Sequence, residues 1–333
     1  MHSDKAVQYS TRRNMSIDMI KIIAMLGVIM LHTTHDLMST NGLDIASFMY
    51  KSAVISIPLF FMVSGYLLLG RPNIDYRYSI KKIYGILRYM TFFCVFYWIV
   101  YSIFKHGFSL ERFWQIFGGS FNAQGPFYVF WYFGVMIIIY LLLPLLNTCY
   151  LRYRHGFMLL TIFMLTLQSI VFSLNLTIGG ELLPPSLKLY NWLTYFLLGG
   201  MIKYKSFTFG NAIIVTIMCI INYGYQVWLI PEIKTDYCSF FYSSVPILVF
   251  VVSVFTFIIS IRFSNDNKLI KMLSKLFLVV FTIHPFFIDK ISFYLGDIQH
   301  VGPILVWLTV SAISIFLSWL LFKIPYANKI FRI

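Results

Sequence analysis

An almost unbroken apolar stretch, IDMIKIIAMLGVIML, runs from Ile17 to Leu31, and His32 follows it directly. Lys21 lies within this stretch, eleven residues before His32. On an α-helix that spacing puts the two side chains within about 20° of one another and about 16 Å apart along the axis. Ionisable groups within a membrane helix are costly and usually face a polar interior, so a stripe that carries both is a candidate functional site.

The composition of the whole chain is that of a polytopic membrane protein. Of its 333 residues, 59% are hydrophobic and 11% are charged, with a mean hydropathy of +0.78, whereas soluble domains carry about 25% charged residues. The net charge of +14 comes from basic residues between apolar spans, which set topology, so no nucleic-acid partner is expected. Four widely separated cysteines show no spacing typical of a metal or disulfide framework, so no metal is expected. The first 16 residues lack a signal-peptide pattern, and we expect the first span to be retained.

Runs of roughly 20 apolar residues predict an all-α protein with about ten transmembrane helices. The sixth run is short, and Gln168, Ser169 and Ser173 interrupt the fifth. No linker or low-complexity tract divides the chain, so residues 1–333 are predicted to form a single transmembrane domain. The predicted spans are Ile17–His35, Phe48–Leu69, Ile83–Phe104, Phe127–Cys149, Phe157–Leu174, Tyr190–Ile202, Ala212–Ile230, Phe241–Ile261, Leu276–Leu295 and Val301–Phe322.

The positive charges between these spans predict that both termini are cytoplasmic, because cytoplasmic loops carry an excess of Lys and Arg. With that orientation the outer segments hold only Lys51, Lys105, Arg112, Lys188, Lys234 and Lys290. The cytoplasmic segments hold Lys5, Arg12, Arg13, Arg71, Arg77, Lys81, Lys82, Arg88, Arg152, Arg154, Lys203, Lys205, Arg262, Lys268, Lys271, Lys275, Lys323, Lys329 and Arg332.

The orientation assigns different surroundings to the two groups of the first helix. Lys21 lies about one turn inside the cytoplasmic surface, and His32 lies towards the outer one. Asp36, one turn after His32, could accept a hydrogen bond from one ring nitrogen and leave the other as a base. A second interpretation stays open: Lys21 anchors the helix at the interface, and His32 is a structural hydrogen-bonding group.

Five segments, in order along the chain, resemble the signatures of one family. Lys21-x10-His32 resembles the Arg/Lys-x10-His motif of the acyltransferase-3 family of membrane acyltransferases, and Ser16-Ile17-Asp18 fits the start of that helix. The remaining matches are PLFFMVSGYLL at 58–68, Trp131-Tyr132-Phe133 with Tyr140 and Pro144, Phe196-Leu197-Leu198-Gly199, and Leu273-Ser274-Lys275 with Ile283-His284-Pro285. Where the family often has Arg-x-x-Arg at the start of the third helix, this chain has Lys81-Lys82-Ile83-Tyr84-Gly85, so the bidentate geometry of arginine is lost.

The resemblance implies transfer of an acetyl group from cytoplasmic acetyl-CoA to a hydroxyl group at the outer face. Lys21, Lys81, Lys82 and Arg88 would bind the phosphates of the donor, although the lysine pair could equally serve topology alone. His32 would act as the general base, a step worth about 10²–10⁴-fold, or as a nucleophile that forms an acetyl-imidazole. The chain is similar to short members that modify lipid-linked or surface glycans, of the O-antigen or enterobacterial common antigen type, in the bacterial inner membrane.

Three further residues are weaker candidates for substrate binding or oxyanion stabilisation. Ser64 could stabilise an oxyanion, but Ser64-Gly65 is more typical of close helix packing. His284 could take part in catalysis or only satisfy a backbone carbonyl released by Pro285. Trp131 could stack on a sugar or belong to an interfacial aromatic belt.

Two other functions are compatible with ten spans. A flippase for a lipid-linked saccharide is one, but the expected pair of half-repeats with matching broken helices is not evident in the sequence. A polysaccharide polymerase is the other, although the outer loops are short for one. Consumption of acetyl-CoA separates the acyltransferase from both alternatives.

Overall fold

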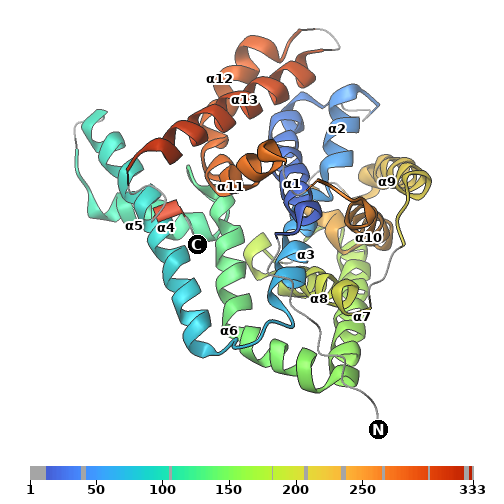
Figure 1. The fold of residues 1–333 in the computed structure, drawn as a ribbon. Helices are drawn as coiled ribbons and strands as arrows, with labels where there is room; N and C mark the ends of the chain where they lie inside the picture. Colours follow the sequence, from blue (N-terminus) through green and yellow to red (C-terminus); the bar gives the residue numbers. More distant parts are fainter. Residues whose placement is uncertain are drawn as a thin grey trace.

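The computed structural model describes residues 13–38, 43–104, 107–181, 183–205, 209–233, 238–264, 267–298, 301–325 and 330–331, and in these ranges the chain is helical without strands (Figure 1). The α-helices are α1 (Met15–Thr34), α2 (Ile45–Ala53), α3 (Ser56–Leu68), α4 (Tyr76–Phe104), α5 (Leu110–Phe121), α6 (Trp131–Arg152), α7 (Arg154–Ile178), α8 (Leu189–Lys205), α9 (Ala212–Ile233), α10 (Val245–Ser260), α11 (Lys268–Ile283), α12 (Pro285–Leu295) and α13 (Gly302–Lys323). Short 3-10 helices are η1 (His35–Leu37), η2 (Tyr128–Phe130), η3 (Pro185–Leu187) and η4 (Cys238–Ser243).

Seven of the predicted spans coincide with helical segments long and apolar enough to cross a membrane. They contain α1, α2 with α3, α4, α6, α7, α9 and α13. The other three predicted spans fall on α8 and α10, which are short, and on α11 with α12, which are bent by 76° relative to one another. The total of ten spans and the cytoplasmic termini therefore stay predictions. Lys5, Arg12, Lys105, Lys234, Lys329 and Arg332 lie outside the described residues.

The first helix is the central element of the bundle. Asn14 caps it by accepting hydrogen bonds from the backbone N–H groups of Ser16 and Ile17, which satisfies two of the unpaired donors at a helix start. It packs against α2, α3, α10, α11, α12 and α13, and Figure 1 shows it near the middle of the molecule. The stripe that carries Lys21 and His32 therefore faces other helices.

Helices α3 and α8 approach one another at backbone distance. A Cβ atom added to Gly65 would lie 1.7 Å from the carbonyl oxygen of Phe196, and one added to Gly199 would lie 2.0 Å from that of Met62. Gly65 of the SGYLL segment on α3 thus contacts the backbone of α8, and Gly199 of the FLLG segment on α8 contacts the backbone of α3. Small residues permit such close packing in membrane helices, which confirms the packing interpretation for Gly65.

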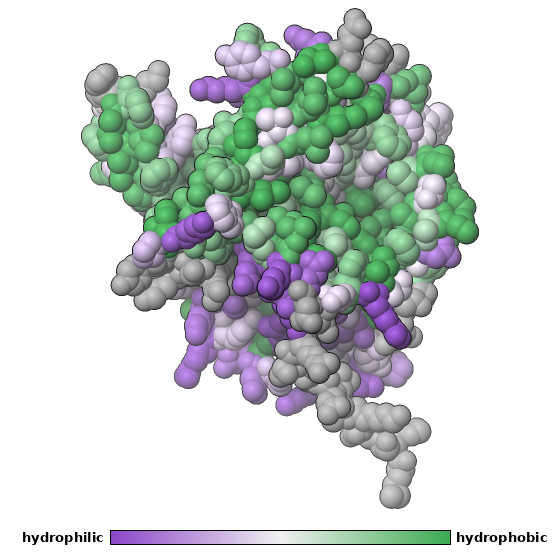
Figure 2. Space-filling view, turned by 45° about the horizontal axis from the view of Figure 1, so that its top comes forward, coloured by the Kyte–Doolittle hydropathy of each residue, from purple (hydrophilic) through white to green (hydrophobic). Residues whose placement is uncertain are grey.

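The surface separates into an apolar band and a hydrophilic end. Figure 2 shows hydrophobic residues across most of the visible face, with hydrophilic residues gathered below them. Large apolar side chains on α4, α7, α9 and α13 are exposed, among them Phe96, Leu159, Ile213 and Leu308. Contiguous exposed apolar surface of this kind is what a lipid bilayer covers.

Candidate functional site

Lys21 is held at one end of α1 by a chain of polar contacts. Its Nζ lies 3.6 Å from Oδ1 of Asp18, and Asp18 also forms an ion pair with Arg13. Arg13 in turn donates through Nη2 to Oγ of Ser274 on α11, at 2.6 Å. The Lys21 ammonium lies 6.0 Å from the ring centroid of Phe277, also on α11. Asp18 and Arg13 therefore fix Lys21 beside α11.

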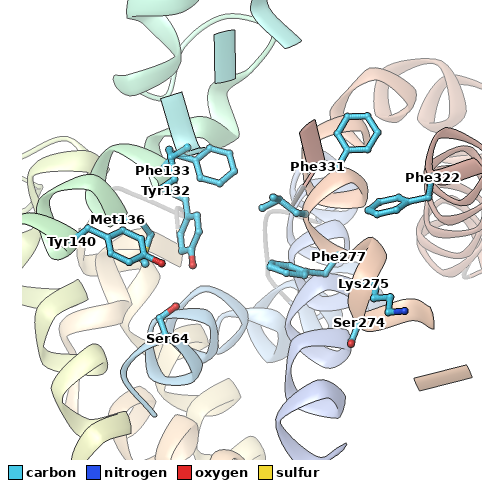
Figure 3. A pocket seen from close by; sticks show the side chains of 12 residues that line it. Ser64, Tyr132, Phe133, Met136, Tyr140, Ser274, Lys275, Phe277, Phe322 and Phe331 are labelled. Atoms are coloured by element: carbon cyan, nitrogen blue, oxygen red, sulfur yellow. The ribbon is translucent and has the colours of Figure 1, made fainter. Parts of the chain in front are cut away.

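A cavity of about 390 Å³ lies next to this contact, between α3, α4, α6, α11 and α13. In Figure 3, Ser64, Tyr132 and Tyr140 lie on one side of it and Ser274, Lys275 and Phe277 on the other. The hydroxyl groups of Ser64 and Tyr132 point toward one another, and the Ser64 hydroxyl donates a hydrogen bond to the carbonyl oxygen of Phe60 at 2.9 Å. The remaining lining residues are Ile86, Phe133, Met136, Leu278, Phe322 and Phe331. The cavity is thus aromatic, with hydroxyl groups from three helices.

A second, basic cavity of about 360 Å³ shares Lys275 and Phe322 with the first. Lys268, Lys271 and Lys275 line it from α11, and Trp319 lines it from α13. Residues three and four apart lie on the same face of a helix, so the three ammonium groups share one face of α11. Together the two cavities are basic at one end and apolar with hydroxyl groups at the other.

Of the predicted donor-binding residues, only Lys21 contacts the cavity wall directly. Lys81 and Arg88 are exposed, and neither they nor Lys82 lines either cavity. Lys82 places its Nζ 5.8 Å from the ring centroid of Tyr78 and is only one turn before Ile86, which lines the first cavity. The predicted cluster therefore lies outside the two cavities.

Arg71 is a candidate that the sequence interpretation treated as a topology charge alone. It interacts electrostatically with Lys21, Lys82 and Lys203, and also with Tyr140 in the wall of the first cavity. Its backbone oxygen accepts a hydrogen bond from Nδ2 of Asn147 on α6, at 2.9 Å. Arg71 therefore lies near Lys21, Lys82 and Lys203, which come from different segments of the chain, and near the wall of the first cavity.

His32 lies at the other end of the α1 stripe, among aromatic rings. Its ring centroid is 5.0 Å from that of Tyr128, in an edge-to-face contact, and 5.4 Å from that of His284. His284 stands between α11 and α12, where the bend occurs. The fold thus brings His32 and His284 together, although 252 positions separate them in the sequence.

The predicted hydrogen bond between His32 and Asp36 is wrong. Asp36 is exposed, and its Oδ1 lies 2.6 Å from Nδ1 of the adjacent His35. The α-helix ends at Thr34, and residues 35–37 continue as a 3-10 helix. Because the helical rotation changes there, Asp36 does not follow His32 on the α-helical face, and it acts on His32 only as a nearby charge, without a hydrogen bond.

Trp131 belongs to a buried aromatic cluster at the start of α6. Its ring lies 5.1 Å from Trp192 on α8, which is fully buried and stacks at 5.0 Å on Phe61 of α3. Lys188, just before α8, is fully buried and forms an ion pair with Glu181. The sequence prediction, which placed Lys188 in an outer loop, did not include this ion pair between a buried lysine and the exposed Glu181.

An aromatic layer separates the first cavity from His32 and His284. Phe281 lies 5.9 Å from Tyr132 on the cavity side and 6.1 Å from His284 on the other side. Phe60 contacts both Phe277 and Phe281, with centroids 5.7 Å and 6.2 Å away. A molecule in the cavity therefore meets these rings before it reaches the imidazoles.

Comparison with known proteins gives one match. A family model described as an acyltransferase domain matches residues 14–323, which include both cavities' helices and both histidines. No curated protein and no solved structure matches the chain.

Proposed function

The chain belongs to the acyltransferase-3 family, and from this premise we propose that it is a membrane O-acetyltransferase. In this proposal it moves an acetyl group from cytoplasmic acetyl-CoA to a hydroxyl group of a cell-envelope glycan at the periplasmic face of the inner membrane. The observation that carries the donor assignment is the pair of neighbouring cavities that share Lys275 and Phe322, one basic and one aromatic with hydroxyl groups.

The chemistry of acetyl-CoA matches the order of these two cavities. Its nucleotide carries phosphates, which Lys268, Lys271 and Lys275 would bind through charge-assisted hydrogen bonds. Its adenine would stack on Trp319 in the same cavity, as bases stack on aromatic side chains. Its narrow pantetheine arm and thioester would then extend past Lys275 towards Ser64 and Tyr132.

The cations beside the first cavity would support the same donor. Lys21 and Arg71 would add positive potential along the route of the pantetheine arm and the diphosphate. Lys82 would contribute to that potential from the first turns of α4. Lys81 and Arg88, which are exposed, would then chiefly increase the rate at which the negatively charged donor associates with the protein.

Transfer itself is assigned to His32. The imidazole would remove the proton from the acceptor hydroxyl, whose oxygen forms a bond to the carbonyl carbon of the thioester. The carbon–sulfur bond breaks, and the departing thiolate takes the proton from the imidazolium. To reach His32, the thioester would have to pass Phe60 and Phe281, whose ring centroids lie 6.2 Å apart. In the alternative route, a His32 nitrogen first forms a bond to the thioester carbonyl carbon as the carbon–sulfur bond breaks and the thiolate leaves. The acceptor oxygen then attacks the acetyl-imidazole, the carbon–nitrogen bond breaks, and the acceptor proton passes to the thiolate.

The acceptor would enter from the opposite end of α1. Tyr128 borders His32, and Trp131 and Trp192 lie at the start of α6 and on α8. Tyr128 and Trp131 are only partly buried, and their rings would stack on the apolar faces of sugars, whereas Trp192 is fully buried and supports Trp131. A lipid-linked or surface glycan is therefore the proposed acceptor, of the O-antigen or enterobacterial common antigen type.

The function is tested with purified protein in lipid nanodiscs, supplied with acetyl-CoA and lipid-linked glycans extracted from the host envelope. Release of free thiol and acetylation of the glycan, followed by mass spectrometry, should rise together for the wild type. The His32→Ala variant should insert and accumulate but show neither. Near-normal acetylation by His32→Ala would contradict its assigned role, and glycan movement across vesicles without loss of acetyl-CoA would favour a flippase.

The donor site has its own prediction. Lys271→Glu combined with Lys275→Glu should raise the KM for acetyl-CoA at least about tenfold, since tenfold is about 1.4 kcal/mol and a hydrogen bond to a charged group contributes about 1.5–3 kcal/mol. The control is Lys290→Glu on α12, an exposed lysine away from both cavities, which should leave KM unchanged. An unchanged KM in the double variant would show that the nucleotide binds elsewhere.

A further inference from the structure

His284 occupies a position that only the bend between α11 and α12 creates. The two helices differ in direction by 76°, and His284 is the residue between them. Its side chain is fully buried. Its ring centroid lies 5.4 Å from that of His32, with the ring planes 33° apart. The bend thus directs a second imidazole at the proposed general base.

The hydrogen bonds of His284 define which nitrogen carries its proton. Nδ1 lies 3.3 Å from the carbonyl oxygen of Val280. A carbonyl oxygen can only accept, so Nδ1 is the donor and Nε2 keeps a lone pair in the neutral ring. Nε2 is buried and has no hydrogen-bond partner among the described residues. A buried acceptor without a donor is unfavourable. The nearest ring is that of His32, but neither of its nitrogens is hydrogen-bonded to Nε2 in this structure.

We infer that His284 is the positioning residue of His32: its Nε2 accepts a hydrogen bond from one ring N–H of His32, which leaves the other His32 nitrogen as the base. This inference rests on the proposed function of His32. A hydrogen bond of about 3 Å between edge nitrogens of two such rings puts their centres about 5 Å apart. The ring centres are already 5.4 Å apart, so the bond, which is not formed in this structure, requires a rotation of one ring and no movement of the helices.

The pairing replaces the one predicted with Asp36. The Asp36 carboxylate is bound to His35 at the exposed end of the helix, whereas His284 is buried beside His32. A neutral imidazole also costs less free energy to bury within a membrane than a carboxylate, because burying an unpaired charge there carries a large desolvation cost. His284 would then have both a structural and a functional role. Its Nδ1 donates a hydrogen bond to the Val280 carbonyl oxygen, and its Nε2 orients His32.

Two substitutions separate these nitrogens. In His284→Asn the amide reaches the position of Nδ1, and in His284→Gln it reaches that of Nε2. The Asn variant keeps the contact to Val280 and loses the acceptor for His32, while the Gln variant keeps the acceptor. We expect kcat to fall at least about tenfold in His284→Asn and much less in His284→Gln. The KM for acetyl-CoA should be unchanged in both, because His284 lines neither cavity.

A measurement without substrate tests the pairing itself. Protein labelled with ¹⁵N-histidine in lipid nanodiscs gives nitrogen signals that report the tautomer of each ring, and the spectrum of His32→Asn identifies the signals of His32. These signals should shift in His284→Asn and stay unchanged in His155→Asn, a control that removes an exposed imidazole on α7.

The outcomes are distinct. Unchanged His32 signals in His284→Asn, or wild-type kcat in that variant, would overturn the inference. Equal loss of kcat in the Asn and Gln variants with unshifted His32 signals would assign His284 to structure alone and would also overturn it. If the wild type consumes no acetyl-CoA while the His32 signals respond to His284→Asn, the pairing stands and the proposed function fails.

Discussion

Lys21 illustrates how one charge is kept within a membrane helix. Asp18 is close to both Lys21 and Arg13, so the carboxylate stays paired with Arg13 when Lys21 is replaced. Substitution at position 21 should therefore affect ligand binding more than folding. The Lys21 ammonium beside Phe277 lies at the wall of the first cavity, where a phosphate-bearing donor would pass.

Lys21→Ala should raise the KM for acetyl-CoA about tenfold, equivalent to about 1.4 kcal/mol, with little change in kcat. Lys21→Arg should remain near the wild type, because a cation at that depth is what the donor requires. Initial rates of thiol release at varied acetyl-CoA concentration measure both constants, and Lys290→Ala provides the exposed control. Equal donor affinity in Lys21→Ala and Lys21→Arg would remove Lys21 from donor binding.

At this scale the sequence predicts residues whose neighbours are set by one helix. The spacing of Lys21 and His32 needs only a regular helix, and both lie on α1. The predicted hydrogen bond from His32 to Asp36 is wrong because the position of Asp36 depends on where that helix ends. The hydroxyl groups of Thr33 and Thr34 donate hydrogen bonds to the carbonyl oxygens of Ile29 and Met30 just before the α-helix changes to a 3-10 helix. The sequence does not reveal where that change occurs.

Residues brought together from distant segments are beyond such reasoning. The sequence does not distinguish Lys271 from other lysines predicted to be cytoplasmic, and it marks Lys275 only as part of the Leu273-Ser274-Lys275 segment. Only the packing of α11 against α13 places the two around a cavity with Trp319. Arg71 similarly requires the contact between the end of α3 and Asn147 of α6. The distribution of charges along the sequence predicts on which side of the membrane such residues lie, but it does not predict which residues they contact in the fold.

The element scale is dominated by the approach of α3 to α8. Gly65→Ala should lower the melting temperature by several degrees, since the new methyl group would lie 1.7 Å from a backbone oxygen that no side-chain rotation can move. Overpacking costs about 1–3 kcal/mol. Gly199→Ala should have a similar effect from the other side of the same contact. Thermal unfolding followed by fluorescence-detected size exclusion measures both.

Gly224→Ala on α9 is the matched control, because nothing lies within 4 Å of an added Cβ there. Alanine favours a helix over glycine by roughly 1 kcal/mol, so this variant should be as stable as the wild type or slightly more stable. A wild-type melting temperature for Gly65→Ala would show that α3 and α8 separate easily and that the glycines are not required for packing.

Helices are predicted from the sequence as far as length and apolar character define them. Seven spans meet that condition, whereas α8 and α10 are shorter than a full crossing. The bend at His284 follows from Pro285, which lacks a backbone N–H, but its angle depends on packing. The amphipathic helix α5, between α4 and α6, lies in a segment that the search for long apolar runs leaves out.

At the scale of the whole molecule, the cavities and the imidazole pair lie at different depths along α1. Lys21 and its neighbours border the first cavity, and His32 with His284 lies beyond the aromatic layer of Phe60 and Phe281. The hydrophilic end of the surface in Figure 2 fits the predicted cytoplasmic side. Donor and acceptor would then reach the reacting atoms from opposite sides.

This arrangement predicts that the acetyl group crosses the membrane during the reaction. Orientation is measured first, in a variant whose native cysteines Cys94, Cys149, Cys219 and Cys238 have been replaced. A single cysteine at His155, at the start of α7, should react with an impermeant reagent only from the cytoplasmic side. One at Asp297, between α12 and α13, should react only from the outer side.

In sealed vesicles of that known orientation, acetyl-CoA is then supplied only at the cytoplasmic face, and the glycan acceptor is confined to the opposite face. Acetylated glycan should accumulate there, and none should form when acetyl-CoA is supplied at the acceptor face alone. The reason is that the basic cavity lies on the side of Lys21, about 16 Å along α1 from His32. If acetylation instead requires both substrates on the cytoplasmic side, transfer through the membrane is wrong even where His32 is essential, and a separate flippase must export the product.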